Sequence, residues 1–207
     1  MNKHWYLIGV ELPLRKVPSR HLRELVKWCV EWGVGFFLVN IDGLKERDVL
    51  DALDVIRKGA EVYHTVTLVE SRLDLALVGG ASGILLLEGG LPVDRVRGIF
   101  RKGVVGFVPM CITSLKESVR GRVDFFVVDE RTPKDVLERA LEFDVPVIWR
   151  GHGDYRTVDR VFSLGVEGYC LSGKALLKRD APKVVQRLKG KVGKYVSYKV
   201  LHQGNHL

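Results

Sequence analysis

Eight short apolar runs alternate along the chain with segments in which apolar residues recur at helical spacing. The runs are nearly continuous in hydrophobicity, as in strands that are buried on both faces. The predicted strands cover residues 5–10, 35–40, 62–69, 83–87, 103–108, 124–128, 145–149 and 168–171. The predicted helices cover residues 19–32, 45–58, 71–78, 92–100, 114–120, 133–143, 155–164 and 182–188. This alternation is typical of repeated βα units on a parallel sheet.

The number and spacing of these units favour a closed barrel. Eight units fit into the first 188 of the 207 residues, with short connections and no Pro-, Gly- or Ser-rich linker. An open doubly wound sheet uses the same alternation, but here the first predicted strand is not followed by the Gly-x-Gly-x-x-Gly motif of that fold. We therefore predict one (β/α)8 TIM barrel over residues 1–190, followed by a basic C-terminal tail over residues 191–207.

The excess charge of the chain is concentrated near its C-terminus. Thirty-three Lys and Arg residues against 25 Asp and Glu residues give a net charge of +8. Between residues 174 and 199 a single acidic residue, Asp180, accompanies nine basic residues, which are Lys174, Lys178, Arg179, Lys183, Arg187, Lys189, Lys191, Lys194 and Lys199. This segment holds the whole excess, so the charge does not mark the barrel itself as a nucleic-acid-binding fold.

No segment of the sequence indicates export or membrane insertion. No apolar run approaches the roughly 18 residues needed to span a bilayer, and the apolar stretch 5–10 ends at Glu11 without a cleavage site. Cys29, Cys111 and Cys170 form no Cys-x-x-Cys pair, so neither a disulfide framework nor a zinc site is indicated. We expect a cytoplasmic protein with no membrane partner.

Acidic residues follow many of the predicted strands. In a barrel the C-terminal strand ends surround one mouth, so these side chains are expected to converge. They are Glu11, Asp42, Glu70, Glu88, Asp129 and Glu130. Like charges in a partly desolvated mouth should raise the pKa of at least one carboxyl, which suits an acid/base site, whereas a divalent cation would neutralise them instead. The alternative is that they are solvated surface charges.

The loops after the seventh and eighth predicted strands have the composition of a phosphate site. Gly151 and Gly153 expose backbone N–H groups, and Ser172, Gly173 and Lys174 add a hydroxyl, a further N–H group and a cation at the start of a helical turn. Barrels bind phosphate at this corner, where free amides and helix N-termini stabilise an anion. We predict phosphate binding there, with ordinary turn and cap residues as the alternative.

From about Tyr6 to Leu188 the chain resembles the thiamine-phosphate synthase and thiazole tautomerase superfamily. The matching stretches include residues 71–76 (Ser-Arg-Leu-Asp-Leu-Ala), 113–118 (Thr-Ser-Leu-Lys-Glu-Ser) and 165–168 (Gly-Val-Glu-Gly). The resemblance implies a TIM barrel and a transferase of thiamine biosynthesis. Such an enzyme joins hydroxymethylpyrimidine diphosphate to a thiazole phosphate and releases pyrophosphate, with magnesium holding the diphosphate.

The functional motifs of the synthases are largely changed in this chain. The family's Gln-x-Arg-x-Lys motif falls on Leu38, Asn40 and Asp42, and its Asn-Asp-Arg motif falls on residues 70–72, Glu-Ser-Arg. Its Gly-Gln-x-Asp motif falls on residues 87–90, where a glycine stands in place of the aspartate. Both magnesium aspartates are therefore missing, so we assign no metal ligand and leave magnesium open as a cofactor. Standard synthase activity is not expected, because nothing stabilises the departing pyrophosphate.

The tautomerase branch of the superfamily also lacks the magnesium residues and uses a histidine after strand six to move a proton. That position falls on Glu130. By this resemblance Glu130 is the first candidate for a catalytic carboxylate, and Glu70 is the second. The alternative role of Glu130 is an exposed cap of the sixth helix.

These observations predict a divergent synthase-like or tautomerase-like enzyme that binds a small phosphorylated molecule, for instance a thiazole phosphate. The alternative is a non-catalytic barrel that regulates or binds a partner through its basic C-terminus. Residues 194–199 interleave lysines with tyrosines, as single-strand binders do, but a solvated tail explains them equally well and we do not expect nucleic acid binding. Trp28 and Trp32 would suit a homodimer contact, but we predict that both are core residues.

Overall fold

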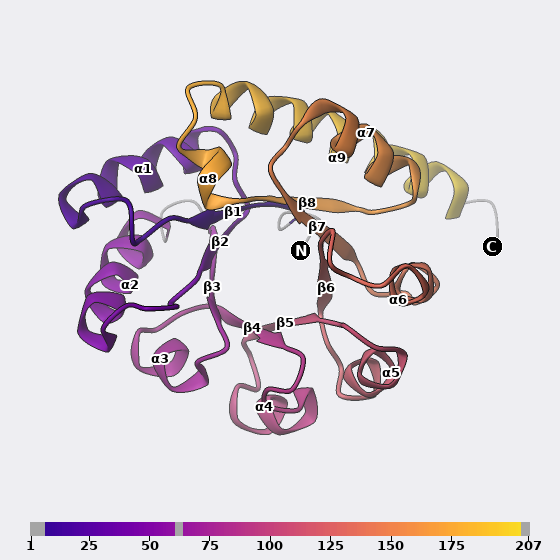
Figure 1. Cartoon of the computed structure of the whole chain (residues 1–207), viewed down its shortest axis with the longest axis horizontal. Coiled ribbons are helices and arrows are strands. Elements are labelled where there is room, and N and C mark those ends of the chain that lie inside the picture. Colours follow the sequence, from indigo (N-terminus) through magenta and orange to yellow (C-terminus); the bar gives the residue numbers. More distant parts are fainter. Residues whose placement is uncertain (1–6, 61–63, 204–207) are drawn as a thin grey trace.

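The eight strands of the chain form a closed parallel barrel with helices around its outside (Figure 1). The structure is a computed structural model that describes residues 7–60 and 64–203, with side chains in the last helix described as far as residue 192. The strands are β1 (Ile8–Leu12), β2 (Phe36–Val39), β3 (Val66–Glu70), β4 (Gly83–Leu87), β5 (Val104–Val108), β6 (Phe125–Val128), β7 (Val147–Gly151) and β8 (Gly168–Leu171). They pair in chain order, and β8 also pairs with β1, which confirms the predicted (β/α)8 TIM barrel.

The helices follow the strands in strict alternation until the last strand. They are α1 (Ser19–Glu31), α2 (Glu46–Ala60), α3 (Leu73–Val78), α4 (Val93–Ile99), α5 (Ile112–Arg120), α6 (Lys134–Ala140), α7 (Tyr155–Ser163), α8 (Gly173–Leu176) and α9 (Ala181–Gln203). Each presents an apolar stripe to the outward side chains of the strands, so that one continuous core separates the strands from the helices. None of the helices in the described part of the chain combines the length and the apolar character needed to cross a membrane.

A second core fills the inside of the barrel. Its buried members are Phe36, Leu38, Val66, Leu68, Leu85, Val108, Phe125, Val127, Ile148 and Cys170. The rings of Phe36 and Phe125 fit inside the barrel because the neighbouring strand has a glycine at the paired position. A Cβ at Gly9 would lie 2.0 Å from the ring of Phe36, and a Cβ at Gly106 would lie 2.4 Å from the ring of Phe125. The barrel is thus packed shut below its mouth.

Two of the strands that carry predicted mouth residues extend further than their apolar runs. Strand β1 was predicted over residues 5–10 but continues to Leu12, and β3 was predicted to end at residue 69 but includes Glu70. Hydrophobicity marks burial, whereas strand ends are decided by pairing: Glu11 pairs with Leu38, and Glu70 pairs with Leu85. Residues 5, 6, 62 and 63 of the predicted strands lie outside the described residues.

The chain after β8 differs from the prediction. A four-residue helix, α8, begins at Gly173 directly after the strand, and α9 runs over Ala181–Gln203 instead of residues 182–188. Position 190, the predicted boundary between barrel and tail, therefore falls inside a helix. A separate role for residues 191–207 stays a prediction.

Trp28 corrects one expectation about the core. Its side chain is 50% exposed, whereas Trp32 is partly buried against the outer core. The buried stripe of α1 consists of Leu22, Leu25, Val26, Cys29 and Val30, and Trp28 lies outside it. The spacing of the two tryptophans showed that they share a side of the helix, but not which side faces the barrel.

Candidate active site

Polar side chains form the floor of the barrel mouth because they continue the inward rows of the strands. Inward and outward residues alternate along a strand. On β3 the inward residue Leu68 is followed two positions later by Glu70, and on β7 Ile148 is followed by Arg150. Asp129 continues the row of β6 in the same way. Each of these polar groups thus lies directly above the apolar layer inside the barrel.

The mouth contains a cavity of about 710 Å³, which we call the mouth cavity. It is lined by Glu11, Asn40, Asp42, Glu70, Leu87, Glu88, Val108, Met110, Asp129, Glu130, Arg131, Trp149, Arg150, Gly151, His152, Asp154, Thr157, Arg160 and Ser172. All six carboxylates predicted from the strand ends are among these residues, so the expected convergence is confirmed.

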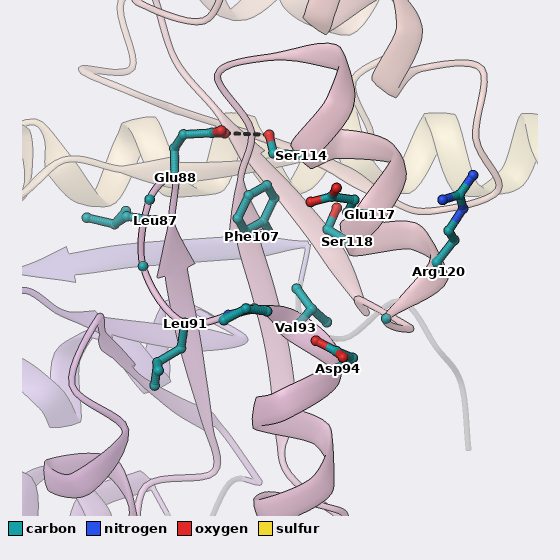
Figure 2. Close-up of a pocket in the computed structure, with 14 residues that line it drawn as sticks. Leu87, Glu88, Leu91, Val93, Asp94, Phe107, Ser114, Glu117, Ser118 and Arg120 are labelled. Carbon is teal, nitrogen blue, oxygen red and sulfur yellow. Dashed lines mark hydrogen bonds between the residues drawn. The ribbon is translucent and has the colours of Figure 1, made fainter.

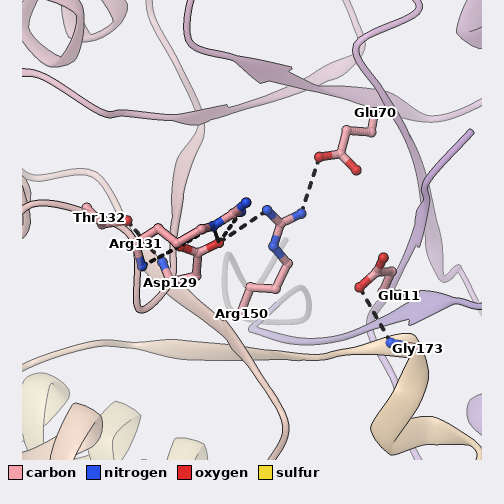
Figure 3. A network of polar contacts seen from close by, with 7 residues as sticks. All are labelled: Glu11, Glu70, Asp129, Arg131, Thr132, Arg150 and Gly173. Atoms are coloured by element: carbon pink, nitrogen blue, oxygen red, sulfur yellow. Dashed lines mark hydrogen bonds and ion pairs between the residues drawn. The ribbon is translucent and has the colours of Figure 1, made fainter. Parts of the chain in front are cut away.

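Arg150 links carboxylates from two other strands across the floor (Figure 3). Its Nη1 lies 3.2 Å from Oε1 of Glu70, and its Nη2 lies 3.4 Å from Oδ2 of Asp129. Asp129 also accepts a 2.6 Å hydrogen bond from Nη2 of Arg131 at the rim. The side chains of Glu70, Asp129 and Arg150 are only 8–12% exposed, so little solvent screens this network.

The same network has opposite effects on its two carboxylates. Burial raises the pKa of Glu70 above its ordinary value, and the charge and hydrogen bond of Arg150 offset this only in part. Burial also raises the pKa of Asp129, but the hydrogen bonds and charge of Arg131 outweigh it, so the pKa of Asp129 is lowered. The surroundings of Glu70 therefore favour its protonated form more than water does.

One oxygen of Glu70 has no partner in the described structure. Oε2 is buried and receives no hydrogen bond, although Oε1 is bonded to Arg150. A buried, unsatisfied acceptor is rare and costs about 1–3 kcal/mol unless a partner reaches it. Glu70 lines the mouth cavity, so a ligand bound there is the group that can supply the missing bond.

Glu130 is placed differently from Glu70. It lines the mouth cavity but is exposed, because it follows the inward Asp129 by one position and so falls on the other side of the row. The structure thus brings Glu130 to the rim and Glu70 to the floor. The catalytic role of Glu130 stays a prediction.

Glu88 holds another part of the rim together. Its carboxylate accepts hydrogen bonds from Oγ of Ser114 at 2.5 Å and from the backbone N–H of Met110 at 2.9 Å. Beyond this contact, between the loop after β4 and helix α5, lies an outer groove of about 540 Å³ with Phe107 and Val93 in its wall (Figure 2). Glu88 separates this groove from the mouth cavity, since it lines both.

A smaller cavity of about 420 Å³ adjoins the mouth cavity at the β1 and β8 side. We call it the basic pocket; it is lined by Glu11, Leu12, Pro13, Leu14, Arg15, Lys16, Asn40, Asp42, His152, Ser172, Gly173 and Lys174. Its three cations form no ion pair within the described residues. The sequence pattern did not single out Arg15 and Lys16, because they lie in the loop beyond the end of β1 rather than at the strand end itself.

The predicted phosphate residues do not all face one cavity. Gly151 lines the mouth cavity, Gly173 and Lys174 line the basic pocket, and Ser172 lines both. Gly153 lies apart from them: it is buried, and its N–H donates to the hydroxyl of Tyr169 at 2.9 Å. Its φ of +74° explains the need for glycine as backbone conformation rather than ligand contact.

The backbone amides of the basic pocket already have partners. The N–H of Gly173 points at Oε2 of Glu11, at 3.5 Å, and the N–H of Ser172 donates to the carbonyl of Gly151 at 2.8 Å. The contact with Glu11 is long and involves a carboxylate, so an incoming anion would replace one acceptor with another. Side-chain cations and the hydroxyl of Ser172, which lies 2.6 Å from Nδ1 of His152, remain as the main anion-binding groups.

The mouth does not fit the magnesium of the family. Within the described residues, no three His, Cys, Asp or Glu side chains are grouped so that they could hold a metal ion. Two of the carboxylates are turned to Arg150 instead, which supplies the positive charge at the centre of the floor. The guanidinium of Arg150 therefore neutralises Glu70 and Asp129, as a metal ion would otherwise do.

Sequence comparison finds the chain similar to thiamine-phosphate synthases. The protein from Halalkalibacterium halodurans is 24% identical over 177 residues, covering 79% of this chain and 84% of the relative. The protein from Pyrococcus abyssi is 22% identical over 194 residues, covering 86% of this chain and 94% of the relative. No family model matches the chain.

Two solved structures share the fold. The thiamine phosphate pyrophosphorylase from Pyrococcus furiosus superposes with a TM-score of 0.76 at 18% identity, covering 93% of this chain and 98% of that one. A 3-hexulose-6-phosphate synthase superposes with a TM-score of 0.64 at 15% identity, covering 89% of this chain and 99% of that one. Together with the sequence similarities, these findings confirm the resemblance stated from the residues.

Proposed function

We propose that this chain, a distant member of the thiamine-phosphate synthase superfamily, binds a small phosphorylated compound across the mouth cavity and the basic pocket, and transfers a proton at Glu70. The observation that carries the proposal is the junction of the two cavities. They share Glu11, Asn40, Asp42, His152 and Ser172, so one ligand can place its phosphate among cations and its body above the buried Glu70–Arg150 pair.

The phosphate would lie in the basic pocket. Arg15 and Lys16 come from the loop after β1, and Lys174 comes from α8 on the opposite wall. Cations that lack ion pairs gain most from a dianionic phosphate, because no existing contact is lost. The hydroxyl of Ser172, which also lines the pocket, completes the donor set.

Proton transfer would use Oε2 of Glu70. Arg150 holds Oε1 and is itself fixed by Asp129, which leaves Oε2 without a partner among the described residues. The raised pKa of Glu70 brings the carboxyl nearer to the operating pH, where a general acid or base works best. This order of candidates reverses the one that the resemblance implied, since Glu130 is exposed at the rim.

The synthase reaction itself is not supported by these residues. The positions that grip the diphosphate in the family are Leu38, Asn40 and Asp42 here, and Leu38 is buried inside the barrel. A proton transfer on a compound such as a thiazole phosphate, within thiamine metabolism, needs none of the missing groups. The tautomerase-like reaction is therefore the one we propose.

Calorimetry with inorganic phosphate and with a thiazole phosphate tests the binding step. We expect Arg15→Ala and Lys174→Ala each to weaken binding by about 10-fold or more, as for loss of a charged hydrogen bond. Lys116→Ala removes an exposed cation on α5 that has no described ion pair, and should leave binding unchanged. Equal affinities for wild type and Lys174→Ala, or no binding at all, would reject the phosphate site.

Turnover of a thiazole phosphate tautomer tests the proton transfer. The wild type and Glu130→Gln should convert it, while Glu70→Gln should lose about 100-fold or more of the rate. Loss of the rate in Glu130→Gln alone would restore Glu130 as the catalytic carboxylate. An inactive wild type would reject the tautomerase reaction and leave the binding step to be judged by calorimetry.

The alternative of a non-catalytic barrel acting through its basic C-terminus is weakened by α9. Arg187 stacks on the ring of Tyr155 with 4.8 Å to the centroid, and Lys191 pairs with Asp159 at 2.5 Å. These two cations attach α9 to α7 and are less available to a partner. Salt-dependent binding of an oligonucleotide to the full chain would nevertheless favour this alternative.

A further inference from the structure

The mouth cavity carries a marked excess of negative charge. Seven carboxylates and three arginines line it. Arg131 and Arg150 are already engaged with Asp129 and Glu70, so they neutralise charges of the floor rather than those of the wall. A ligand whose body is neutral or anionic would leave these carboxylates facing one another in a partly desolvated space.

Glu70 and Glu11 both line the mouth cavity, and we call the space between their carboxylates the gap. Figure 3 shows the second oxygen of Glu70 turned away from Arg150, toward the side of the network where Glu11 lies. Glu70 is 6% exposed and this oxygen has no partner among the described residues, while Glu11 makes only the long contact with Gly173. Both groups accept hydrogen bonds and neither donates when ionised, so the group that fits between them is a donor with positive charge.

Among the described residues, no cationic side chain occupies this gap, and the carboxylates around it do not form a metal site. Arg150 is engaged with Oε1 of Glu70 and with Asp129, and not with Oε2 of Glu70 or with Glu11. The carboxylates around the gap are not grouped closely enough to hold a metal ion, as far as the described residues go. An organic cation is larger, brings its own N–H donors and can reach separate carboxylates.

We propose that the ligand is a zwitterion, with its phosphate in the basic pocket and a protonated amine or amidine nitrogen between Glu70 and Glu11 in the mouth cavity. This inference rests on the proposed phosphate binding and adds the chemical class of the other end. A thiazole phosphate, whose ring carries no such cation, then tests the phosphate end and the proton transfer but does not fill both ends of the site. The neighbouring positions of the two cavities, one acidic and one basic, fix the orientation of the ligand.

A pair of probes separates the two ends of the ligand. Pyridoxamine 5′-phosphate and pyridoxine 5′-phosphate share the ring and the phosphate, and differ in an ammonium group against a hydroxyl. Calorimetry at neutral pH should show the ammonium probe binding about 10-fold or more tightly to the wild type, as for a buried charged hydrogen bond. Glu70→Gln should bring the two affinities within about 2-fold of each other by removing that charged acceptor.

Variants then assign the preference to the gap. Lys174→Ala should weaken both probes by the same factor, because both carry the phosphate. Glu117→Gln removes an exposed carboxylate outside the mouth cavity and should keep the full preference. If Glu70→Gln does not fold, as judged by its thermal transition, Glu11→Gln provides the second removal of charge and should also shrink the preference.

The outcomes distinguish this inference from the proposed function. Equal binding of both probes to the wild type, or a preference that survives both Glu70→Gln and Glu11→Gln, overturns the zwitterion and leaves the phosphate site in place. Binding of inorganic phosphate alone, lost in Lys174→Ala, has the same meaning. Failure of every phosphate compound to bind overturns the proposed function as well.

Discussion

Three carboxylates of the mouth differ in their burial and in their contacts with arginine. Glu70 is buried against one arginine, Asp129 is buried against two, and Glu130 is exposed. Desolvation dominates at Glu70 and raises its pKa, whereas the arginines prevail at Asp129 and lower its pKa. For Glu70 and Asp129, the balance between burial and arginine contacts thus decides the direction of the pKa shift.

Glu70→Gln should change the pH dependence of stability. The folded pKa of Glu70 lies above its unfolded value, so the wild type is most favoured below the unfolded pKa and loses that stabilisation as pH rises through the folded pKa. The variant cannot titrate and lacks this loss. Urea unfolding between about pH 4 and pH 8 should therefore show the free energy of unfolding of wild type falling relative to the variant as pH rises.

Glu130→Gln is the matched control for that measurement. It removes a carboxyl from the same cavity, but one that is exposed. A fall that appears only in the comparison with Glu70→Gln would assign it to the buried carboxyl. A slope at Glu130 equal to that at Glu70 would contradict the assignment of burial as the cause.

Single residues of the mouth were predictable from the sequence to different degrees. The alternation of inward and outward positions on β6 already distinguishes Asp129 from Glu130, yet the resemblance favoured Glu130. The pairing of Glu70 with Arg150, 80 positions away, could not be predicted, because the rotation of two strands in a closed barrel decides which inward residues meet. Arg15 and Lys16 could not be predicted, because they lie in the loop after Leu12, and the pattern of apolar residues does not give the path of a loop.

Elements in this fold are matched in pairs, large against small. Strand β1 has no side chain at Gly9, which pairs with Phe36 of β2, and β5 has none at Gly106, which pairs with Phe125 of β6. The two rings lie with centroids 6.2 Å apart inside the barrel. The strands can therefore approach evenly even though aromatic side chains fill the interior.

Gly9→Ala should destabilise the chain by about 1–3 kcal/mol, because the new methyl group would overlap the ring of Phe36. Chemical unfolding measures this. Phe36→Leu should relieve the clash, so the double variant should lose less than the sum of the single changes. Gly98→Ala in α4, where nothing lies within 4 Å of the new Cβ, should be neutral or stabilising by up to about 1 kcal/mol.

Periodicity predicted the elements well where they are long and regular, and poorly after β8. Helix α8 has four residues, too few for a repeat of apolar positions to appear. Helix α9 continues past Gly190, although a glycine is a common signal for a helix end, because one glycine costs a helix only about 1 kcal/mol. Element type was predictable from local pattern, whereas the length of α9 was not.

The whole molecule protects two of its three thiols. Cys29 is buried under α1, where burial raises its pKa to about 12, and Cys170 is buried inside the barrel, which also raises its pKa. Cys111 is exposed at the start of α5. Reactivity of the thiols therefore reports on the integrity of the closed barrel.

A chromogenic disulfide reagent should titrate one thiol in the native protein and three after unfolding. Cys111→Ser should abolish the fast reaction and leave two thiols that react only on global opening. Rapid modification of two or more thiols in the native wild type would mean that the barrel opens far more easily than its packing implies.

The barrel can close only after its last strand has been synthesised. Strand β1 is the first strand to leave the ribosome and pairs with both β2 and β8. Strand β8 is some 160 positions away and is the last strand to emerge, so Ile8 cannot pair with Tyr169 until then. Until then the nascent sheet has a free edge at β1 and at its growing end, and such edges are where chains associate wrongly. Ribosome-bound chains that end before residue 168 should therefore be sensitive to protease and depend on chaperones, and resistance should appear in one step once β8 is free of the tunnel.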